Sequence, residues 1–237
     1  MDFGLVLGIF GIVVTVAVAV VSNFYQWQVV RGLKKIFTHL TTPSDYIGAT
    51  AAIHKGHYDV RVLAHTPGLL LPSERDAWPI RERNDYFDVI HHRLRETEAY
   101  HLEYLFDLSE YKSVLASYLA SPDVEMREKK ISDAKGMFLS VIAHTKTGGA
   151  LRLKYTVLAA GTPSMVIGEE SVAGVGYRPL PSPRNTEWVI IHEPALVKIV
   201  KYQFQSLFDQ ATDVGPGFFD NVLQSLEASA DSKSSAG

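Results

Sequence analysis

Residues 59–66 read DVRVLAHT, a run of apolar and β-branched residues that Pro67 and Gly68 bring to an end. Such a run before a Pro-Gly pair is typical of a strand that leads into a loop. Residues 84–96 carry apolar side chains at helical spacing, and residues 100–108, YHLEYLFDL, again read as a strand. The order strand, helix, strand predicts a βαβ unit, and therefore a parallel or mixed sheet.

The sequence on either side extends this pattern to an α/β fold with a mixed sheet and flanking helices. Helices are predicted at residues 46–54, 109–120 and 123–145, the last with a break near Gly136. After Gly148 and Gly149 the pattern changes to short apolar runs, which predict strands at residues 151–158, 164–167, 172–175 and 188–192. A helix at 195–211 and a short one at 218–226 follow, and the tail from Ser229 is too polar to order itself.

The first part of the chain reads as a membrane anchor. Residues 3–21, from Phe3 to Val21, contain no charged side chain, and as a helix they would extend roughly 28 Å, close to the ~30 Å hydrocarbon core of a bilayer. Trp27 follows with other aromatic residues, as expected at a membrane interface, and then come three basic residues, Arg31, Lys34 and Lys35. The positive-inside rule places the amino terminus outside and the domain in the cytoplasm. A cleaved signal peptide is the alternative, because residues 17–19 imitate a cleavage site.

Two features near this anchor leave alternatives open. Gly4 and Gly8 form a GxxxG pair that would allow two spans to approach closely and the chain to form a homodimer, although glycine is common in membrane helices in any case. Residues 29–40 have apolar side chains at helical spacing, so they would continue the helix as a stalk or lie on the lipid headgroups. The chain therefore divides into an anchor (residues 1–28), a helical stalk (29–57), an α/β domain (58–228) and a disordered tail (229–237).

Composition excludes several classes of function. The net charge of −3 gives no electrostatic reason to expect nucleic-acid binding. The chain has no cysteine, which excludes disulfides and thiolate metal sites. Nine histidines are scattered, and the adjacent pair His91 and His92 would point about 100° apart on a helix, so no metal site is predicted. No P-loop or dinucleotide-binding motif occurs, so no cofactor is predicted.

Polar residues follow the first two predicted strands. His65 and Thr66 end the first, and Asp107 ends the second. In open α/β sheets ligands bind at the carboxyl ends of the strands, so these side chains would line a binding site. The alternative is that Pro67 and Gly68 make a turn and Asp107 caps the next helix.

The second half of the chain carries a spacing that resembles a known family. Gly168, Glu169 and Glu170 read as the turn of a hairpin, and Gly176 follows seven residues after Glu169. With the element order, this resembles the phospholipase-D-like fold over residues 58–211. In that family a strand carries His-x-Lys, the hairpin turn carries an Asp, and a loop Gly follows. Here the His and Lys positions fall on Thr162 and Ser164.

The resemblance implies a domain that has lost its catalytic residues. In the family the histidine attacks phosphorus and the lysine stabilises the developing charge, which threonine and serine cannot do. A non-catalytic domain would keep the site for a ligand or a partner, and the predicted ligand-binding residues are His65, Thr66, Asp107, Thr162, Ser164 and Glu169.

Three functional hypotheses remain. The first is a membrane-anchored, cytoplasmic, ligand-sensing or protein-interaction domain, in bacterial signalling or defence. The second is a phosphodiesterase or phospholipase-like hydrolase that acts as a dimer and uses His144 and Lys146 with Glu169 or Asp107, since His144-Thr145-Lys146 is a displaced His-x-Lys. The third is a membrane adaptor whose basic residues contact lipid or a partner.

Overall fold

The computed structural model describes residue 32 and residues 36–40, 42–65, 67–71, 84–96, 99–146, 150–177 and 187–234. The chain divides into two compact units, Met1–Thr38 and His39–Gly237. The predicted membrane span, its GxxxG pair and Trp27 lie outside the described residues. Within the described ranges, none of the helices combines the length and the apolar character that crossing a bilayer requires.

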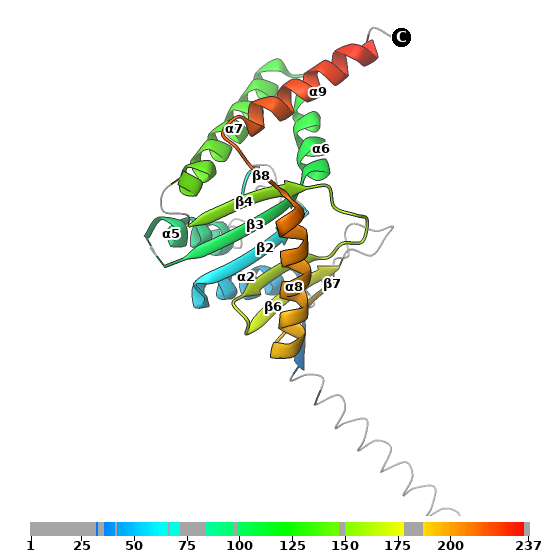
Figure 1. Ribbon diagram of the computed structural model, residues 1–237. Coiled ribbons are helices and arrows are strands. Elements are labelled where there is room, and N and C mark those ends of the chain that lie inside the picture. The colour runs from blue at the N-terminus through cyan, green and yellow to red at the C-terminus, as the bar shows by residue number, and fades with distance from the viewer. Residues whose placement is uncertain are drawn as a thin grey trace, which may run out of the picture. The chain divides into compact units, whose positions relative to one another are not determined.

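One mixed sheet of eight strands organises the fold (Figure 1). Its order is β1-β7-β6-β5-β2-β3-β4-β8. Strands β2, β3 and β4 are parallel, while β5 pairs with β2, and β8 with β4, in the antiparallel sense. The bounds are β1 Phe37–Leu40, β2 Asp59–Ala64, β3 His101–Asp107, β4 Leu151–Thr156, β5 Ser164–Gly168, β6 Val172–Tyr177, β7 Glu187–Ile191 and β8 Thr212–Asp213.

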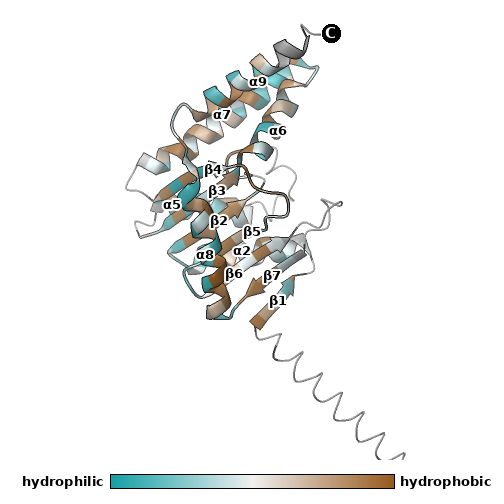
Figure 2. Ribbon diagram, turned by 45° about the vertical axis from the view of Figure 1, so that its right-hand side comes forward, coloured by the Kyte–Doolittle hydropathy of each residue, from teal (hydrophilic) through white to brown (hydrophobic). Residues whose placement is uncertain are grey.

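Helices cover both faces of this sheet. Most of them share one core with the sheet, and α8 packs on β5 and β6 (Figure 1). Figure 2 shows hydrophobic and hydrophilic segments alternating along α7 and α9, as expected for helices with one buried face. The bounds are α2 Pro43–Gly56, the π-helix η1 Asn84–Asp88, α5 Val89–Glu96, α6 Leu108–Leu119, α7 Val124–Lys146, α8 Pro194–Gln210 and α9 Phe218–Ser234.

Alternation along the strands explains the two layers. In β3, Leu102 and Tyr104 belong to the main core with the helices, while Glu103 and Leu105 point to the opposite face. On that face the buried side of α8 supplies Val197, Val200, Phe204 and Phe208. The predicted α/β class, with a mixed sheet and flanking helices, is confirmed.

One segment differs in type from its prediction. Apolar spacing predicted a helix as far as Leu40, but Phe37–Leu40 form β1, the neighbour of β7 in the sheet. The segment FTHL contains an aromatic and a β-branched residue, which fit a pleated surface, and it is hydrogen-bonded to β7 at the edge of the sheet. Tertiary pairing therefore overrides the local helical pattern.

Two helices differ from their predictions, α7 in having no break and α9 in being longer. Helix α7 continues without a break through Gly136, because Ala134 and Phe138 on either side are fully buried and hold the helix in place. Helix α9 continues to Ser234, where the polar composition predicted disorder from Ser229. Extending an existing helix costs much less than starting one, and the Ser229 hydroxyl donates to the Ser225 carbonyl at 2.7 Å.

Candidate functional site

Three of the predicted site residues lie together at the carboxyl edge of the parallel strands. Ala64 in β2 is the register partner of Phe106 in β3, so the next residues, His65 and Asp107, are also neighbours. His65 Nδ1 lies 3.8 Å from Asp107 Oδ2, and His65 Nε2 contacts the Thr162 carbonyl. The side chains of His65 and Asp107 are 20% and 7% exposed, so the pair is largely shielded from water.

Asp107 caps the next helix, which is one of the two alternatives that the sequence left open. Its Oδ1 accepts from the Ser109 amide at 3.0 Å and from the Ser109 hydroxyl at 2.6 Å, and so caps α6. The same oxygen accepts from the Leu158 amide at 3.4 Å. Because Oδ2 faces His65, the carboxylate joins the helix cap to the strand-end cluster.

Thr162 and Ser164 lie at the same edge as His65. The next residue, Met165, is the register partner of Leu63, which places Ser164 beside the end of β2. The Thr162 hydroxyl donates to the Ala159 carbonyl at 2.8 Å and therefore stabilises its own loop. Thr66 lies outside the described residues.

Glu169 lies at the other end of β5, so the predicted ligand-binding residues do not form one pocket. Ser164 is the first residue of β5 and Glu169 follows the last one, so the two lie roughly 16 Å apart. Glu169 has a positive φ of 51° in the hairpin turn. Its Oε1 accepts from the Tyr58 amide at 3.3 Å, and its Oε2 lies 3.5 Å from His57 Nδ1. These contacts join the turn to the end of α2.

His144 is also distant from the strand-end cluster. It lies two residues before the end of α7, and α7 leads to the amino end of β4. Asp107 lies at the carboxyl end of the parallel neighbour β3. Burial lowers the pKa of His144, and Arg95 lowers it further. The side chain of Lys146 is outside the described residues. The position of the displaced His-x-Lys is therefore known only through His144.

The glycine that matches the family spacing has a steric role of its own. A Cβ on Gly176 would lie 1.8 Å from Cζ3 of Trp188, which covers this position from β7. Trp188 in turn stacks on Tyr46 of α2, with ring centroids 3.3 Å apart. The absence of a side chain at position 176 is therefore required by the packing of an aromatic residue.

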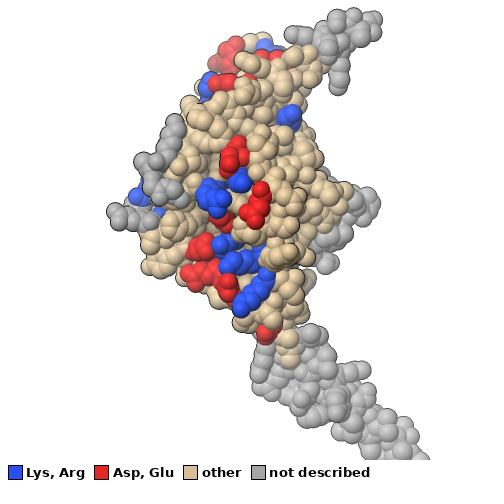
Figure 3. All heavy atoms as spheres, in the orientation of Figure 1, with Lys and Arg blue, Asp and Glu red and all other residues tan. Residues whose placement is uncertain are grey.

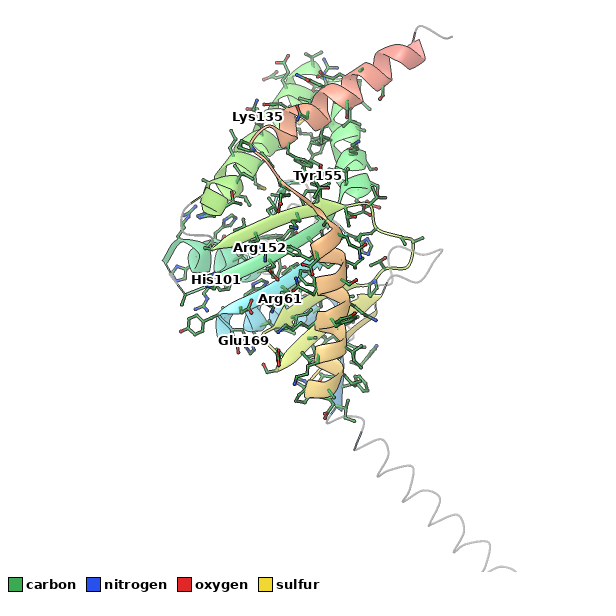
Figure 4. All side chains as sticks on the ribbon, in the orientation of Figure 1. Arg61, His101, Lys135, Arg152, Tyr155 and Glu169 are labelled. Carbon is green, nitrogen blue, oxygen red and sulfur yellow. The ribbon has the colours of Figure 1, made fainter. Side chains whose placement is uncertain are left out.

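Sequence reasoning missed a row of charged residues on the sheet face that carries α8. Arg61 Nε lies 3.0 Å from Glu103 Oε2, and Glu103 Oε1 accepts from Arg152 Nη1 at 2.5 Å. Lys154 and Arg152 each lie 5.0 Å from the centroid of the Phe208 ring. Figure 3 shows blue and red side chains side by side in the middle of this face, and Figure 4 shows Arg152, Arg61 and Glu169 in succession down it. The sequence does carry a signal for this row, because β2, β3 and β4 have charged residues at alternate positions, which point to one face of a sheet.

A buried polar cluster between α2, α5 and β3 was also missed. His54 is fully buried, and its Nδ1 lies 2.7 Å from the Tyr100 hydroxyl. Burial lowers the pKa of His54 to about 3, and Arg93 contributes to that decrease. Arg93 lies over the rings of Tyr58 and Tyr100, at 4.7 and 5.0 Å. The sequence pattern around His54 does not distinguish a buried histidine on a helix from an exposed one.

Within the part of the chain that the structure describes, no group of three or more His, Cys, Asp or Glu side chains is arranged to hold a metal ion.

No protein-family model and no curated protein matches the sequence. Among solved structures, the archaeal chromatin protein TrmBL2 gives a TM-score of 0.46 at 14% identity, over 75% of this chain and 53% of that one. Nuc from Salmonella typhimurium, a phospholipase D family member, gives 0.41 at 11% identity, over 75% and 97%. NucT from Helicobacter pylori gives 0.41 at 9% identity, over the same shares. The chain is thus structurally similar to phospholipase D family proteins, and it spans about half of TrmBL2.

Proposed function

We propose that this chain is a single-pass membrane protein whose α/β domain binds a ligand or a protein partner and does not catalyse phosphoryl transfer. The proposal places residues 3–21 in the bilayer, the amino terminus outside and the domain in the cytoplasm. It also places the binding site at the carboxyl edge of β2 and β3, beside the start of β5. Gly4 and Gly8 would allow two copies to associate in the membrane.

The observation that carries the non-catalytic part is the chemistry at the start of β5. Thr162 and Ser164 stand where the phospholipase-D-like resemblance expects a nucleophilic histidine and a lysine. The Thr162 hydroxyl donates to the Ala159 carbonyl, and no base is arranged to activate it among the described contacts. Ser164 has no charge with which to stabilise a phosphoryl oxygen. Thr162 and Ser164 are therefore suited to hydrogen bonding with a ligand rather than to phosphoryl transfer.

His65 does not replace the missing nucleophile in this arrangement. Its Nε2 faces the Thr162 carbonyl oxygen, and a carbonyl oxygen only accepts, so Nε2 must carry the hydrogen. A nitrogen that donates has no lone pair with which to attack phosphorus. His65 thus serves as a donor to the loop between β4 and β5, which carries Thr162.

The alternative is a dimeric hydrolase that uses His144 and Lys146. Its partner acid would be Asp107 or Glu169. Asp107 lies at the opposite end of the parallel strands from the end of α7, and β3 is seven residues long, roughly 20 Å. Both carboxylate oxygens of Glu169 already face groups at the end of α2. Catalysis through His144 would require these contacts to be replaced.

Hydrolysis and binding assays on the full chain in detergent test the proposal. We expect no hydrolysis of bis(p-nitrophenyl) phosphate above the buffer rate. We expect inorganic phosphate or a glycerophosphodiester to give a saturable increase in melting temperature. Ser164→Glu places a negative charge at the site and should abolish that increase, whereas Ser206→Glu on the exposed side of α8 should preserve it. Hydrolysis that disappears in His144→Ala or His65→Ala would establish an enzyme instead.

A further inference from the structure

One side of α8 carries apolar residues that the folded domain leaves exposed. The other side of this helix packs on β5 and β6 through its buried residues: Val197, Val200, Phe204 and Phe208. Away from the sheet, Ile199 is 55% exposed. Tyr202, at 77%, is more exposed than any other large hydrophobic residue in the described part of the chain. Figure 1 shows α8 in front of the sheet, where a partner can reach it. Apolar surface left in water is typical of an interaction site.

The exposed apolar residues follow the spacing by which two helices pair. The outer row of α8 consists of four exposed residues: Ala195, Ile199, Tyr202 and Ser206. They are separated by steps of four, three and four residues, which place side chains on one line along a helix, as in the seam of a coiled coil. No residue of the outer row is charged. The adjacent Lys198 and Lys201 face Glu170 in the turn between β5 and β6, at 3.8 and 2.8 Å.

The outer row reads the same in both directions by size. Its ends are the small residues Ala195 and Ser206, and its centre is the large pair Ile199 and Tyr202. In an antiparallel pair of α8 helices, a two-fold axis between residues 200 and 201 places Ile199 against the partner's Tyr202. The same axis places Ala195 against the partner's Ser206. A two-fold interface needs one patch that is complementary to itself, and the outer row meets this requirement.

Charges beside the outer row favour the antiparallel direction. Lys198, Gln205 and Asp209 lie on one flank, at steps of seven and four residues. The Lys198 side chain is 64% exposed. Asp209 is also exposed and accepts a hydrogen bond from Gln205 at 2.8 Å. An antiparallel partner turns its Asp209 end toward Lys198, whereas a parallel partner sets two Lys198 side chains next to each other. The charges therefore match a second, antiparallel copy of the helix.

The length of the outer row predicts a weak contact. From Ala195 to Ser206 a helix rises roughly 17 Å, so one helix pair buries well below the ~800 Å² per partner of a standard protein interface. Two chains held in the same membrane have a much higher effective concentration, which would increase the fraction that is paired.

We propose that the outer row of α8 is a two-fold interface between two copies of this chain, made by antiparallel α8 helices. This interface is distinct from the association through Gly4 and Gly8, because it lies in the folded domain and fixes how two domains are oriented. It includes no residue of the proposed binding site, and it rests neither on that site nor on the anchor.

Disulfide cross-linking of the full chain in detergent tests the interface. The chain has no cysteine, so introduced thiols are the only ones. In the double variant Ala195→Cys with Ser206→Cys, the two positions of one chain are roughly 17 Å apart, too far for an internal disulfide. Each thiol instead faces the other position of the partner. On mild oxidation, the double variant should give at least about tenfold more covalent dimer than either single variant, because pairing raises the effective concentration of the facing thiols.

The single variants also serve as controls for direction and for random contact. Antiparallel pairing keeps two copies of position 195, or two copies of position 206, far apart. A parallel pair, or a dimer made only through the membrane span, would cross-link the single variants as readily as the double variant. That result would overturn the proposal. A chain that gives no cross-link in any variant would leave the outer row to another occupant, such as a lipid surface, and would overturn it as well.

A charge at the centre of the outer row provides the second test. Tyr202→Glu, added to the double variant, should reduce the covalent dimer at least about tenfold, because a carboxylate would be buried among apolar side chains. Leu139→Glu adds the same charge to α7 at a position that is 47% exposed, and it should leave the cross-link unchanged. Both positions are exposed, so neither change threatens the fold. Full cross-linking in Tyr202→Glu would refute the interface. The measurement uses no ligand, so its outcome is separate from that of the binding assays.

Discussion

His54 is a fully buried base on α2, and its environment makes stability depend on pH. Burial and the nearby Arg93 hold its pKa at about 3, below the ordinary 6.5. Between these values the unfolded chain binds a proton that the folded chain does not. The free energy of unfolding must therefore decrease as the pH falls through this window.

Replacement of His54 by Gln removes this titration. We expect the wild-type free energy of unfolding to fall by about 1.4 kcal/mol per pH unit more steeply than that of His54→Gln between about pH 6 and pH 4. Denaturant titrations at several pH values provide the measurement. His101→Gln serves as the exposed control and should leave the slope unchanged. Parallel slopes for the wild-type chain and His54→Gln would show that His54 is charged in the fold.

The pair of Arg61 and Glu103 makes a second test at this scale. Their side chains are 10% and 11% exposed, so removing one partner leaves a shielded charge. Glu103→Gln should lower the free energy of unfolding by roughly 3 kcal/mol. The double variant Arg61→Met with Glu103→Leu should lose less, since two apolar groups then replace the pair.

The control for this pair is an ion pair on the surface. Lys135 lies 2.8 Å from Asp220, and both side chains are about half exposed, at 46% and 51%. Lys135→Gln should change stability by less than about 1 kcal/mol. If Glu103→Gln were as mild as this control, water would be screening Arg61 despite its burial.

At the scale of elements, α7 contains a glycine that the helix does not need. Gly136 lies in the middle of α7, is exposed, and a Cβ there would meet nothing within 4 Å. Gly136→Ala should therefore raise the free energy of unfolding by about 1 kcal/mol, because alanine is the better helix former. Equilibrium unfolding in urea measures this. A loss of stability would indicate that the helix bends at this residue.

Local patterns predicted most of the elements because each carries its own periodicity or turn signal. The hairpin at Gly168–Glu170, the strand DVRVLA and the helix after Pro194 each follow from a few adjacent residues. The pairing of His65 with Asp107 was also within reach, since parallel strand ends meet at one edge. The family spacing groups Glu169 with Thr162 and Ser164, whereas the length of β5 places it at the opposite end of the strand from them.

Two features that local patterns missed depend on distant partners. Phe37–Leu40 form a strand because β7 is available to pair with them, which no local pattern records. The burial of His54 likewise depends on Tyr100, which is 46 residues away in sequence. Contacts of this kind come from packing, so they lie outside single-segment reasoning.

At the scale of the whole molecule, the proposed anchor and the folded unit should separate cleanly. The unit His39–Gly237 contains nearly all of the sheet. Chain expressed without residues 1–28 should remain folded and should appear in the soluble fraction, because the nineteen uncharged residues are gone. Carbonate extraction of membranes should leave the full chain in the pellet. Release of the full chain by carbonate would contradict the anchor.

The contact between Gly176 and Trp188 also restricts the order in which this sequence can change over time. Any side chain at position 176 would overlap the indole, so a substitution there is tolerated only after position 188 has become smaller. A smaller residue at 188 would first leave the Tyr46 ring without its stacking partner. A smaller residue at position 188 on β7 must therefore appear before any side chain can be accommodated at position 176 on β6.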